Sequence, residues 1–317
     1  MADRIGQQLG NYQLIQLLGK GTFGEVYLGG HIHLGTLAAV KVMHTQLTRE
    51  DVVSFRTEAR IIAHLIHPNI VRVLEFGIEG DTSFLVMDFA PGGTLRQCYP
   101  KGTLLPLLTI VSYVKQIADA LQYAHDERLI HRDVKPENIL LGRRNEVLLS
   151  DFGIAVLAQS SHSQSPLNTA GTMAYTAPEQ IQGRPCPASD QYSLGIVVYE
   201  WLCGSYPFKG SSALEVAMKH MSALPQPLQE LVPSISLAVQ QVVLQALAKN
   251  PERRYASMRD FSAALEKASV ADESSALKQP SPASAQPPPP ITRTTPPGES
   301  LPTLPAGPPD DTLPTLN

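Results

Sequence analysis

The chain has 317 residues, enough to build two lobes around hydrophobic cores. Its formal net charge of -4 offers no basic surface to a polyanion, which excludes nucleic acid as the main partner. Three cysteines without pairing or metal-ligand spacing indicate a reducing, cytoplasmic compartment. The first residues lack the apolar core of a signal peptide, and no apolar run approaches the roughly 20 residues of a membrane span. We therefore expect neither a signal peptide nor a membrane-spanning helix.

The composition changes near residue 270. Thirteen of the 27 prolines fall within residues 280–317, and this stretch contains no aromatic residue. Such a segment cannot bury enough apolar surface to offset the entropy lost on ordering it. We expect a short lead-in at 1–11, a folded domain at 12–269 and a disordered, Pro-rich tail at 270–317.

The first folded elements are predicted to be two strands joined by glycines. Apolar alternation predicts a strand over 11–18, and a second strand runs through Leu28. Between them, Gly19-Lys20-Gly21-Thr22-Phe23-Gly24 has a spacing that lets backbone N–H groups approach phosphates. A dinucleotide fold would place a helix directly after the glycines. Strand residues follow here, so a phosphate-binding flap is favoured, with an ordinary Gly-rich hairpin as the alternative.

The segment Leu37–Met43 predicts a buried strand that carries one cation, Lys41. A buried ammonium group needs a partner, because burying an unpaired charge is costly. Helical spacing over residues 55–65 places Glu58 on the element that follows, and we expect Glu58 to pair with Lys41. The alternative is that Glu58 lies on a solvated helix face.

Further strands are predicted at 70–76 and 83–89, followed by a hinge at 87–93 that ends in Pro and Gly. An apolar stripe at positions i, i+4 and i+7 predicts a core helix over 110–124. The remaining predicted elements are strands at 138–141 and 147–149 and helices at 190–200, 214–221, 235–247 and 258–268. Strands first and helices after predict an α+β fold, with a small β-rich lobe and a larger helical lobe.

One stretch carries the chemistry: His131-Arg132-Asp133-Val134-Lys135-Pro136-Glu137-Asn138, followed by Asp151-Phe152-Gly153. An acid, a base and an amide followed by a second acid suit metal-assisted phosphoryl transfer. Asp133 would orient an attacking hydroxyl and accept its proton, and Lys135 would neutralise phosphate charge. Asn138 and Asp151 would hold Mg²⁺, which prefers oxygen ligands. A solvated charged loop is the alternative for Arg-Asp taken alone.

Together these motifs resemble a eukaryotic-type serine/threonine protein kinase domain of the bacterial style. They occur in that family's order: glycine loop, Lys41, Glu58, catalytic loop, Asp151-Phe152-Gly153 and Ala177-Pro178-Glu179. The resemblance covers residues 12 to about 266. It implies the bilobal protein-kinase fold, with an N-lobe at about 12–90 and a C-lobe at about 91–269. Lys135 and Gly171-Thr172 resemble serine/threonine rather than tyrosine kinases.

The resemblance implies an ATP site with Mg²⁺, or Mn²⁺ as an alternative, as cofactor. Apolar side chains would enclose adenine, Met87 would be the gatekeeper, and the backbone of Asp88 and Ala90 would pair with the adenine edge. Lys41, positioned by Glu58, would contact the α- and β-phosphates. The full ATP-binding set is Leu18, Gly19, Gly21, Gly24, Val26, Ala39, Lys41, Met87, Asp88, Ala90 and Leu140.

The same resemblance implies supporting contacts. Asp190 would hold the backbone of the catalytic loop, and Arg254 would pair with Glu179. Tyr255 stands where the family usually has Pro, which should affect packing rather than chemistry. A packing column that reports the active state would comprise Ile62, Val73, His131 and Phe152.

Activation is expected to involve phosphorylation between Ser160 and Thr169. Arg132 precedes Asp133, and kinases with Arg there commonly pair it with a phosphorylated loop residue. Thr169 is the first candidate, followed by Ser163 and Ser165. Thr172 is set apart as part of the substrate-binding P+1 loop, with its hydroxyl bonded to Asp133 and Lys135.

Three functions stay open. The first is an active ATP-dependent kinase that phosphorylates Ser and Thr of proteins, with autophosphorylation, in signalling. The second is a pseudokinase scaffold, although pseudokinases commonly lose the equivalent of Lys41, Asp133 or Asp151, all present here. The third, a small-molecule phosphotransferase, is disfavoured by the peptide-holding segment at 171–179.

The tail is expected to accept phosphate on exposed threonines. Thr312, which follows two acidic residues, is the first candidate for docking a phosphothreonine-binding module. A plain solubilising linker is the alternative.

Overall fold

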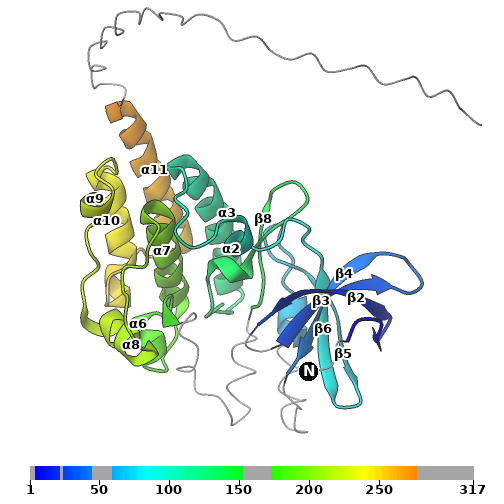
Figure 1. Cartoon of the computed structure of the whole chain (residues 1–317). Coiled ribbons are helices and arrows are strands. Elements are labelled where there is room, and N and C mark those ends of the chain that lie inside the picture. Colours follow the sequence, from blue (N-terminus) through cyan, green and yellow to red (C-terminus); the bar gives the residue numbers. More distant parts are fainter. Residues whose placement is uncertain (1–3, 22–23, 45–58, 153–172, 277–317) are drawn as a thin grey trace, which may run out of the picture. The chain divides into compact units, whose positions relative to one another are not determined.

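The structure, a computed structural model, describes residues 4–21, 24–44, 59–152 and 173–276 (Figure 1). It begins with one antiparallel sheet and continues with helices, which confirms the predicted α+β order. The six strands are arranged as β1-β2-β3-β4-β6-β5. Their bounds are β1 (Gln8–Leu9), β2 (Tyr12–Lys20), β3 (Gly24–His31), β4 (Leu37–Met43), β5 (Val73–Glu79) and β6 (Thr82–Asp88).

Side-chain alternation explains the outer strands, and burial of both faces explains the centre of the sheet. In β2, Tyr12 and Leu14 are buried while Gln13 between them is exposed. In β4 and β6, Val40 faces Val86 across the strands, and both are fully buried. Cross-strand pairs of β-branched residues stabilise a sheet, so these strands form where the apolar runs predict them.

The bounds of the strand predicted over residues 70–76 are wrong, because β5 runs from Val73 to Glu79. Ile70 instead forms a parallel bridge with Leu149, and the Val71 N–H donates to the Leu149 carbonyl at 2.9 Å. The apolar run therefore pairs with two different elements. Its first residues bind the hairpin of β7 (Ile139–Leu141) and β8 (Val147–Leu149), and the rest forms the edge of the sheet.

The helix predicted over residues 55–65 is described only from residue 59, and its last helical residue is Ala63. His64 follows as a turn, in which its backbone N–H donates to the Ile61 carbonyl at 3.2 Å. Glu58 lies outside the described residues, so its pairing stays a prediction.

The C-terminal part is helical apart from one hairpin, β7 (Ile139–Leu141) with β8 (Val147–Leu149). The helices are α2 (Leu95–Cys98), α3 (Leu107–Asp126), α6 (Pro178–Ile181), α7 (Pro187–Cys203), α8 (Ala213–Ser222), α9 (Leu228–Leu231), α10 (Leu237–Ala246) and α11 (Met258–Ala276), with 3₁₀ turns η1 (Pro136–Asn138) and η3 (Pro251–Arg253). The longer predicted helices are confirmed as α3, α7, α8, α10 and α11. The short ones were not predicted, since four residues show no helical period.

The last helix corrects the expected domain boundary. α11 continues through Ala276, so residues 270–276 are helical where the tail was expected to begin. Ala268 and Ser269 are still buried, which shows that the end of the predicted domain packs against the rest. Within the described residues, no helix combines the length and the apolar character needed to cross a membrane.

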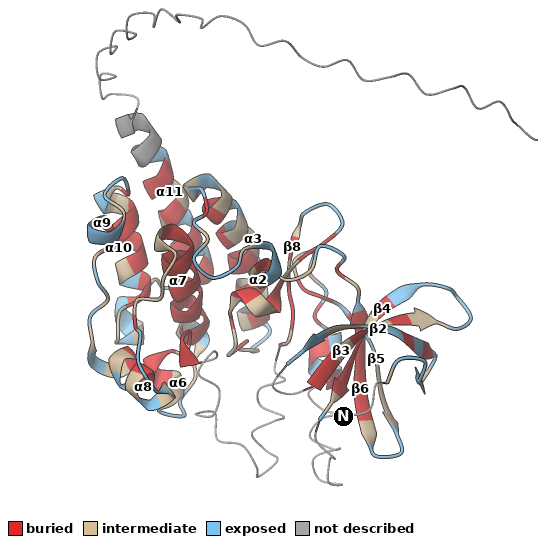
Figure 2. Ribbon diagram, in the orientation of Figure 1, coloured by how far each residue is buried: buried red, intermediate tan, exposed pale blue. Residues whose placement is uncertain are grey.

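Helix α7 forms the centre of the helical region. Nearly every residue from Ser189 to Leu202 is buried (Figure 2). A helix surrounded by protein on all sides does not need an amphipathic pattern. At Gly195, a Cβ atom would lie 3.1 Å from Leu247, so the missing side chain lets α7 approach the end of α10 closely. Polar side chains of this buried helix bind the loops of the site, as described below for Asp190.

Two of the leucines of α3, Leu121 and Leu108, give a matched test of this core. Leu121 is fully buried, whereas Leu108 on the same helix is 57% exposed. Leu121→Ala should lower the free energy of unfolding by about 2–5 kcal/mol, because it leaves a cavity. Leu108→Ala should change it by less than about 0.5 kcal/mol. Urea denaturation followed by circular dichroism measures both, and equal losses would contradict this assignment of the core.

Candidate active site

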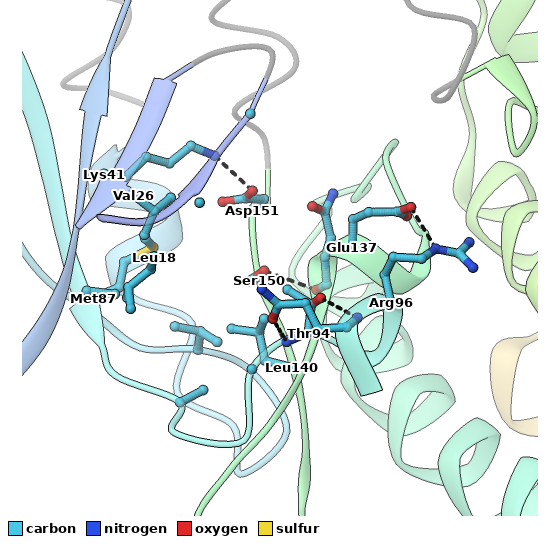
Figure 3. Close-up of a pocket in the computed structure, with 18 of the residues that line it drawn as sticks. Leu18, Val26, Lys41, Met87, Thr94, Arg96, Glu137, Leu140, Ser150 and Asp151 are labelled. Carbon is cyan, nitrogen blue, oxygen red and sulfur yellow. Dashed lines mark hydrogen bonds and ion pairs between the residues drawn. The ribbon is translucent and has the colours of Figure 1, made fainter. Parts of the chain in front are cut away.

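A cavity of about 620 Å³ lies between the sheet, the segment after β6 and the β7–β8 hairpin (Figure 3). Small-molecule sites typically enclose roughly 300–1,000 Å³, so it can hold a nucleotide-sized ligand. Every residue predicted to bind ATP lines it. They are Leu18, Gly19, Gly21, Gly24, Val26, Ala39, Lys41, Met87, Asp88, Ala90 and Leu140.

One end of the cavity is apolar. Val26 and Ala39 come from neighbouring strands of the sheet, and Leu140 comes from β7 (Figure 3). These side chains form an apolar slot, and Met87, near the end of β6, closes it. The chain then turns away, with the Gly93 N–H donating to the Ala90 carbonyl at 3.3 Å. Such a slot suits a flat aromatic ring that bonds to an exposed backbone edge.

The glycine segment covers the cavity where β2 turns into β3. At Gly24, a Cβ atom would lie 2.3 Å from the Val42 carbonyl oxygen, so no other residue fits there. At Gly19, a Cβ would meet nothing within 4 Å, which leaves open space beside the backbone. Lys20 and Glu25 pair at 2.9 Å across the two strands and hold this turn together. Residues 22 and 23 lie outside the described part.

Lys41 projects from β4 into the polar part of the cavity, where its Nζ lies 2.8 Å from Asp151 Oδ2. Its side chain is only 5% exposed, so the predicted need for a counter-charge is met by Asp151 within the described residues. Burial opposes ionisation of Asp151. The Lys41 ammonium outweighs that effect, with help from His131 and Lys135, and holds the pKa of Asp151 below its usual value.

The predicted acid, base and amide of the catalytic loop lie together. Lys135 Nζ is 2.8 Å from Asp133 Oδ2, and the Asn138 side-chain nitrogen donates to the same oxygen at 2.8 Å. The Asn138 nitrogen also donates to the Asp133 carbonyl at 2.8 Å. Because that nitrogen is held by Asp133, a metal would be bound through the amide oxygen.

Asp190 on α7 fixes the backbone of this loop, as the resemblance implied. Its carboxylate accepts hydrogen bonds from the backbone N–H groups of His131 at 2.9 Å and Arg132 at 2.8 Å. His125 Nε2 lies 2.7 Å from the same carboxylate, so this histidine is satisfied within the core. Arg132 and Asp151 both adopt left-handed backbone angles, with φ of 68° and 66°. Non-glycine residues keep such angles only where surrounding contacts impose them.

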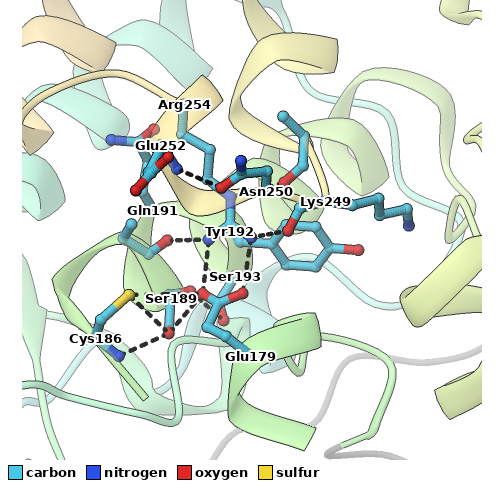
Figure 4. A network of polar contacts seen from close by, with 12 residues as sticks. Glu179, Cys186, Ser189, Gln191, Tyr192, Ser193, Lys249, Asn250, Glu252 and Arg254 are labelled. Atoms are coloured by element: carbon cyan, nitrogen blue, oxygen red, sulfur yellow. Dashed lines mark hydrogen bonds and ion pairs between the residues drawn. The ribbon is translucent and has the colours of Figure 1, made fainter. Parts of the chain in front are cut away.

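A second buried network holds the segment Ala177-Pro178-Glu179 (Figure 4). Arg254 donates two parallel bonds to Glu179, at 2.7 and 2.9 Å, which confirms the pair that the resemblance implied. Ser189 Oγ donates to Glu179 at 2.7 Å. Burial opposes ionisation of Glu179, but the Arg254 guanidinium outweighs it and keeps the pKa of Glu179 low. The segment is thereby anchored to α7 and η3.

Arg96 on α2 also lines the cavity, although no sequence pattern predicted it. It contacts Glu137, Glu200 and Tyr175, all distant in sequence. A single Arg in a four-residue helix carries no pattern that could have revealed these contacts. The candidates Glu58, Ser163, Ser165, Thr169 and Thr172 lie outside the described residues and stay predictions.

The donor set for a metal is small. Among the residues that the structure describes, no group of three or more His, Cys, Asp or Glu could hold a metal ion. Asp151 and Asn138 would supply one carboxylate and one amide. This suits Mg²⁺, which usually takes one or two carboxylates and completes its shell with phosphate oxygens and water.

The chain is similar to known proteins over most of its length. The protein kinase domain family matches residues 12–266. Serine/threonine-protein kinase Pkn1 of Myxococcus xanthus is 39% identical over 83% of this chain and 39% of its own length. PrkC of Bacillus subtilis is 34% identical over 84% of this chain and 42% of its own length. PknA of Mycobacterium tuberculosis is 39% identical over 84% of this chain and 63% of its own length.

These relatives carry the name serine/threonine-protein kinase, and the chain spans 39–63% of their lengths. The matched range contains the glycine segment, Lys41, the catalytic loop and Asp151, which the structure gathers around one cavity. By this match over most of its length, the chain belongs to the protein kinase domain family and resembles its bacterial serine/threonine members.

Proposed function

We propose that the chain is an active ATP- and Mg²⁺-dependent protein kinase that transfers the γ-phosphate to Ser and Thr hydroxyls of proteins, in cytoplasmic signalling. One observation carries the proposal: Lys41, Asp133, Asn138 and Asp151 line the same cavity, where Lys41 pairs with Asp151 and Asn138 bonds to Asp133. A pseudokinase scaffold would not need this set intact.

ATP is the phosphoryl donor in this proposal. The apolar slot of Val26, Ala39 and Leu140 would take the adenine, and Lys41 would pair with the α- and β-phosphates. Mg²⁺ held by Asn138 and Asp151 would neutralise charge on the phosphates. Lys41 and Asp151 already attract one another, so both side chains are positioned at the phosphate end of the cavity.

The acceptor side depends on the catalytic loop. Asp133 would accept the proton of the attacking hydroxyl through its carboxylate, which Lys135 and Asn138 orient. Lys135 would neutralise charge on the transferred phosphoryl group. Asp190 and the buried α7 keep the loop backbone in place, so that these groups do not reorganise during transfer.

Phosphorylation of the chain itself is a second part of the proposal. We infer that Thr169, Ser163 or Ser165 is modified during activation, with Arg132 as the partner of the phosphate. Thr172 would contribute to the P+1 loop rather than accept phosphate. Tail threonines would be accessible acceptors and could recruit phosphothreonine-binding modules, with Thr312 as the first candidate.

Lys41→Met should abolish transfer, because it removes the buried cation of the phosphate end. We expect the rate of ³²P transfer from ATP to a generic acceptor protein to fall at least about 100-fold. Lys115→Met is the matched control, since this lysine is 63% exposed and pairs with Glu266 on the surface. If Lys41→Met retained more than half of the wild-type rate, the assignment of the phosphate site would be wrong.

Asp151→Asn should weaken the dependence on Mg²⁺, because a neutral amide is a poorer ligand for a hard divalent cation. We expect a higher half-saturating Mg²⁺ concentration and a lower maximal rate. The exposed Asp126 provides the control variant, Asp126→Asn. A titration curve of activity against Mg²⁺ that matches the wild type would show that another acid holds the metal.

Autophosphorylation is tested by mapping phosphosites after incubation with ATP and Mg²⁺. The wild type should carry phosphate between residues 160 and 169 and on tail threonines, and Asp133→Asn should carry none. Because α11 reaches Ala276, the tail is best removed after Lys278. That truncation should leave activity on a generic acceptor within about twofold. An inactive truncation, or a tail that stays bare while the loop is labelled, would refute the role given to the tail.

A further inference from the structure

The backbone around Asp133 is held by side chains from several parts of the chain. Asp190 accepts the N–H groups of His131 and Arg132. The Asp133 N–H donates to His131 Nδ1 at 3.2 Å, and the Asp133 carbonyl accepts from Asn138 at 2.8 Å. Between these bonds lies the Arg132 carbonyl, which belongs to the peptide unit that leads into Asp133. The position of Asp133 therefore depends on what holds this carbonyl.

The Arg132 carbonyl accepts a hydrogen bond from Gln180 of α6. Gln180 Nε2 lies 2.6 Å from the carbonyl oxygen, across 48 positions of sequence. A carbonyl oxygen can only accept, so the amide nitrogen of the glutamine must face it. The other end of the amide, Gln180 Oε1, is buried and has no hydrogen-bond partner among the described residues. Within that part of the chain, the bond to the catalytic loop is thus the polar contact that fixes this side chain.

The peptide that Gln180 holds follows a strained residue. Arg132 has a φ of 68°, in the left-handed region that residues with a Cβ rarely adopt. Such a conformation persists only where surrounding contacts impose it. Asp190 binds the N–H of Arg132, and Gln180 binds its carbonyl. Without Gln180, we expect the peptide unit after Arg132 to rotate and to displace the Asp133 carboxylate.

Gln180 is itself anchored firmly. The preceding residue, Glu179, is bound by Arg254 and by Ser189 of α7. The backbone N–H of Gln180 donates to the Ala177 carbonyl at 3.1 Å, which closes the first turn of α6. The start of this helix is therefore a fixed point. A side chain that extends from it can hold the catalytic loop at a set distance.

We propose that Gln180 is a positioning residue for phosphoryl transfer, which orients Asp133 through the Arg132 carbonyl. Gln180 is not among the described residues that line the cavity, so it acts without touching the nucleotide. The inference rests on the proposed kinase function and adds to it a residue of α6. Because α6 directly follows the segment 171–179 that is proposed to hold the acceptor, the same bond ties the geometry of that segment to the catalytic loop.

Gln180→Met tests the donor, because it keeps the length of the side chain and removes the amide. We expect kcat for phosphorylation of a generic acceptor protein to fall at least about tenfold, since displacing a reacting group by about 1 Å can cost about 100-fold. The KM for ATP should stay within about twofold, because the residues that line the cavity are unchanged. A loss of kcat without a change in KM separates the positioning of Asp133 from a general loosening of the fold.

Two matched variants accompany this one. Gln182→Met makes the same substitution at an exposed side chain two residues away, whose amide nitrogen donates to Met221 Sδ at 3.7 Å. It should keep kcat within about twofold of the wild type. Gln180→Glu keeps the shape of the amide, but at neutral pH its carboxylate can only accept, as can the Arg132 carbonyl. It should therefore lower kcat at least as far as Gln180→Met.

Several results would overturn the inference. One is a kcat within about twofold of the wild type in either Gln180 variant, with the fold verified by circular dichroism. Another is a change confined to the KM for ATP. If Gln180→Met does not fold, Gln180→Glu decides, and if neither variant folds, the bond serves stability and the inference fails. If the wild type labels no acceptor protein at all, the proposed kinase function fails instead, and the two failures are distinguishable.

Discussion

The ion pair between Lys41 and Asp151 is the contact on which the candidate site depends. It links β4 of the sheet to the residues that follow β8, across the cavity. Either charge alone would be costly to bury in this position, since removing one partner of a buried pair leaves an uncompensated charge. The pair therefore keeps both charges at the phosphate end, where the proposed function requires them.

Helix α7 provides the second constraint, because it supplies buried polar side chains to three networks. Asp190 near its start binds the backbone of the catalytic loop, and Ser189 binds Glu179. Glu200 near its end binds Arg96. All three are at most 3% exposed. A rigid, buried helix can hold loops in unfavourable backbone conformations, such as that of Arg132, because its own position is set by packing.

These networks differ in what they control. The contacts of Asp190 and the Glu179–Arg254 pair shape the loops without reaching the cavity, so their loss should act through geometry. Arg96 lines the cavity itself and forms ion pairs with Glu137 and Glu200.

The sequence by itself determined the family, the order of the elements and the predicted ATP-binding residues, all of which line the cavity. These features are local: a glycine spacing, a charged octet and apolar periodicity are read within a few residues of one another. The strands predicted over 37–43, 138–141 and 147–149 are present for the same reason. The longer helices also agree, because their apolar stripes span several turns.

Only the tertiary structure decided the bounds of β5, the end of α11 and the partners of the buried charges. Ile70 and Val71 have the composition of a strand in the sheet but bond to Leu149, which is distant in sequence. Lys41 has Asp151 as its counter-charge, and Arg96 meets Glu200 across 104 positions of sequence. Local pattern indicates that a buried charge needs a partner, but packing between distant elements selects which one.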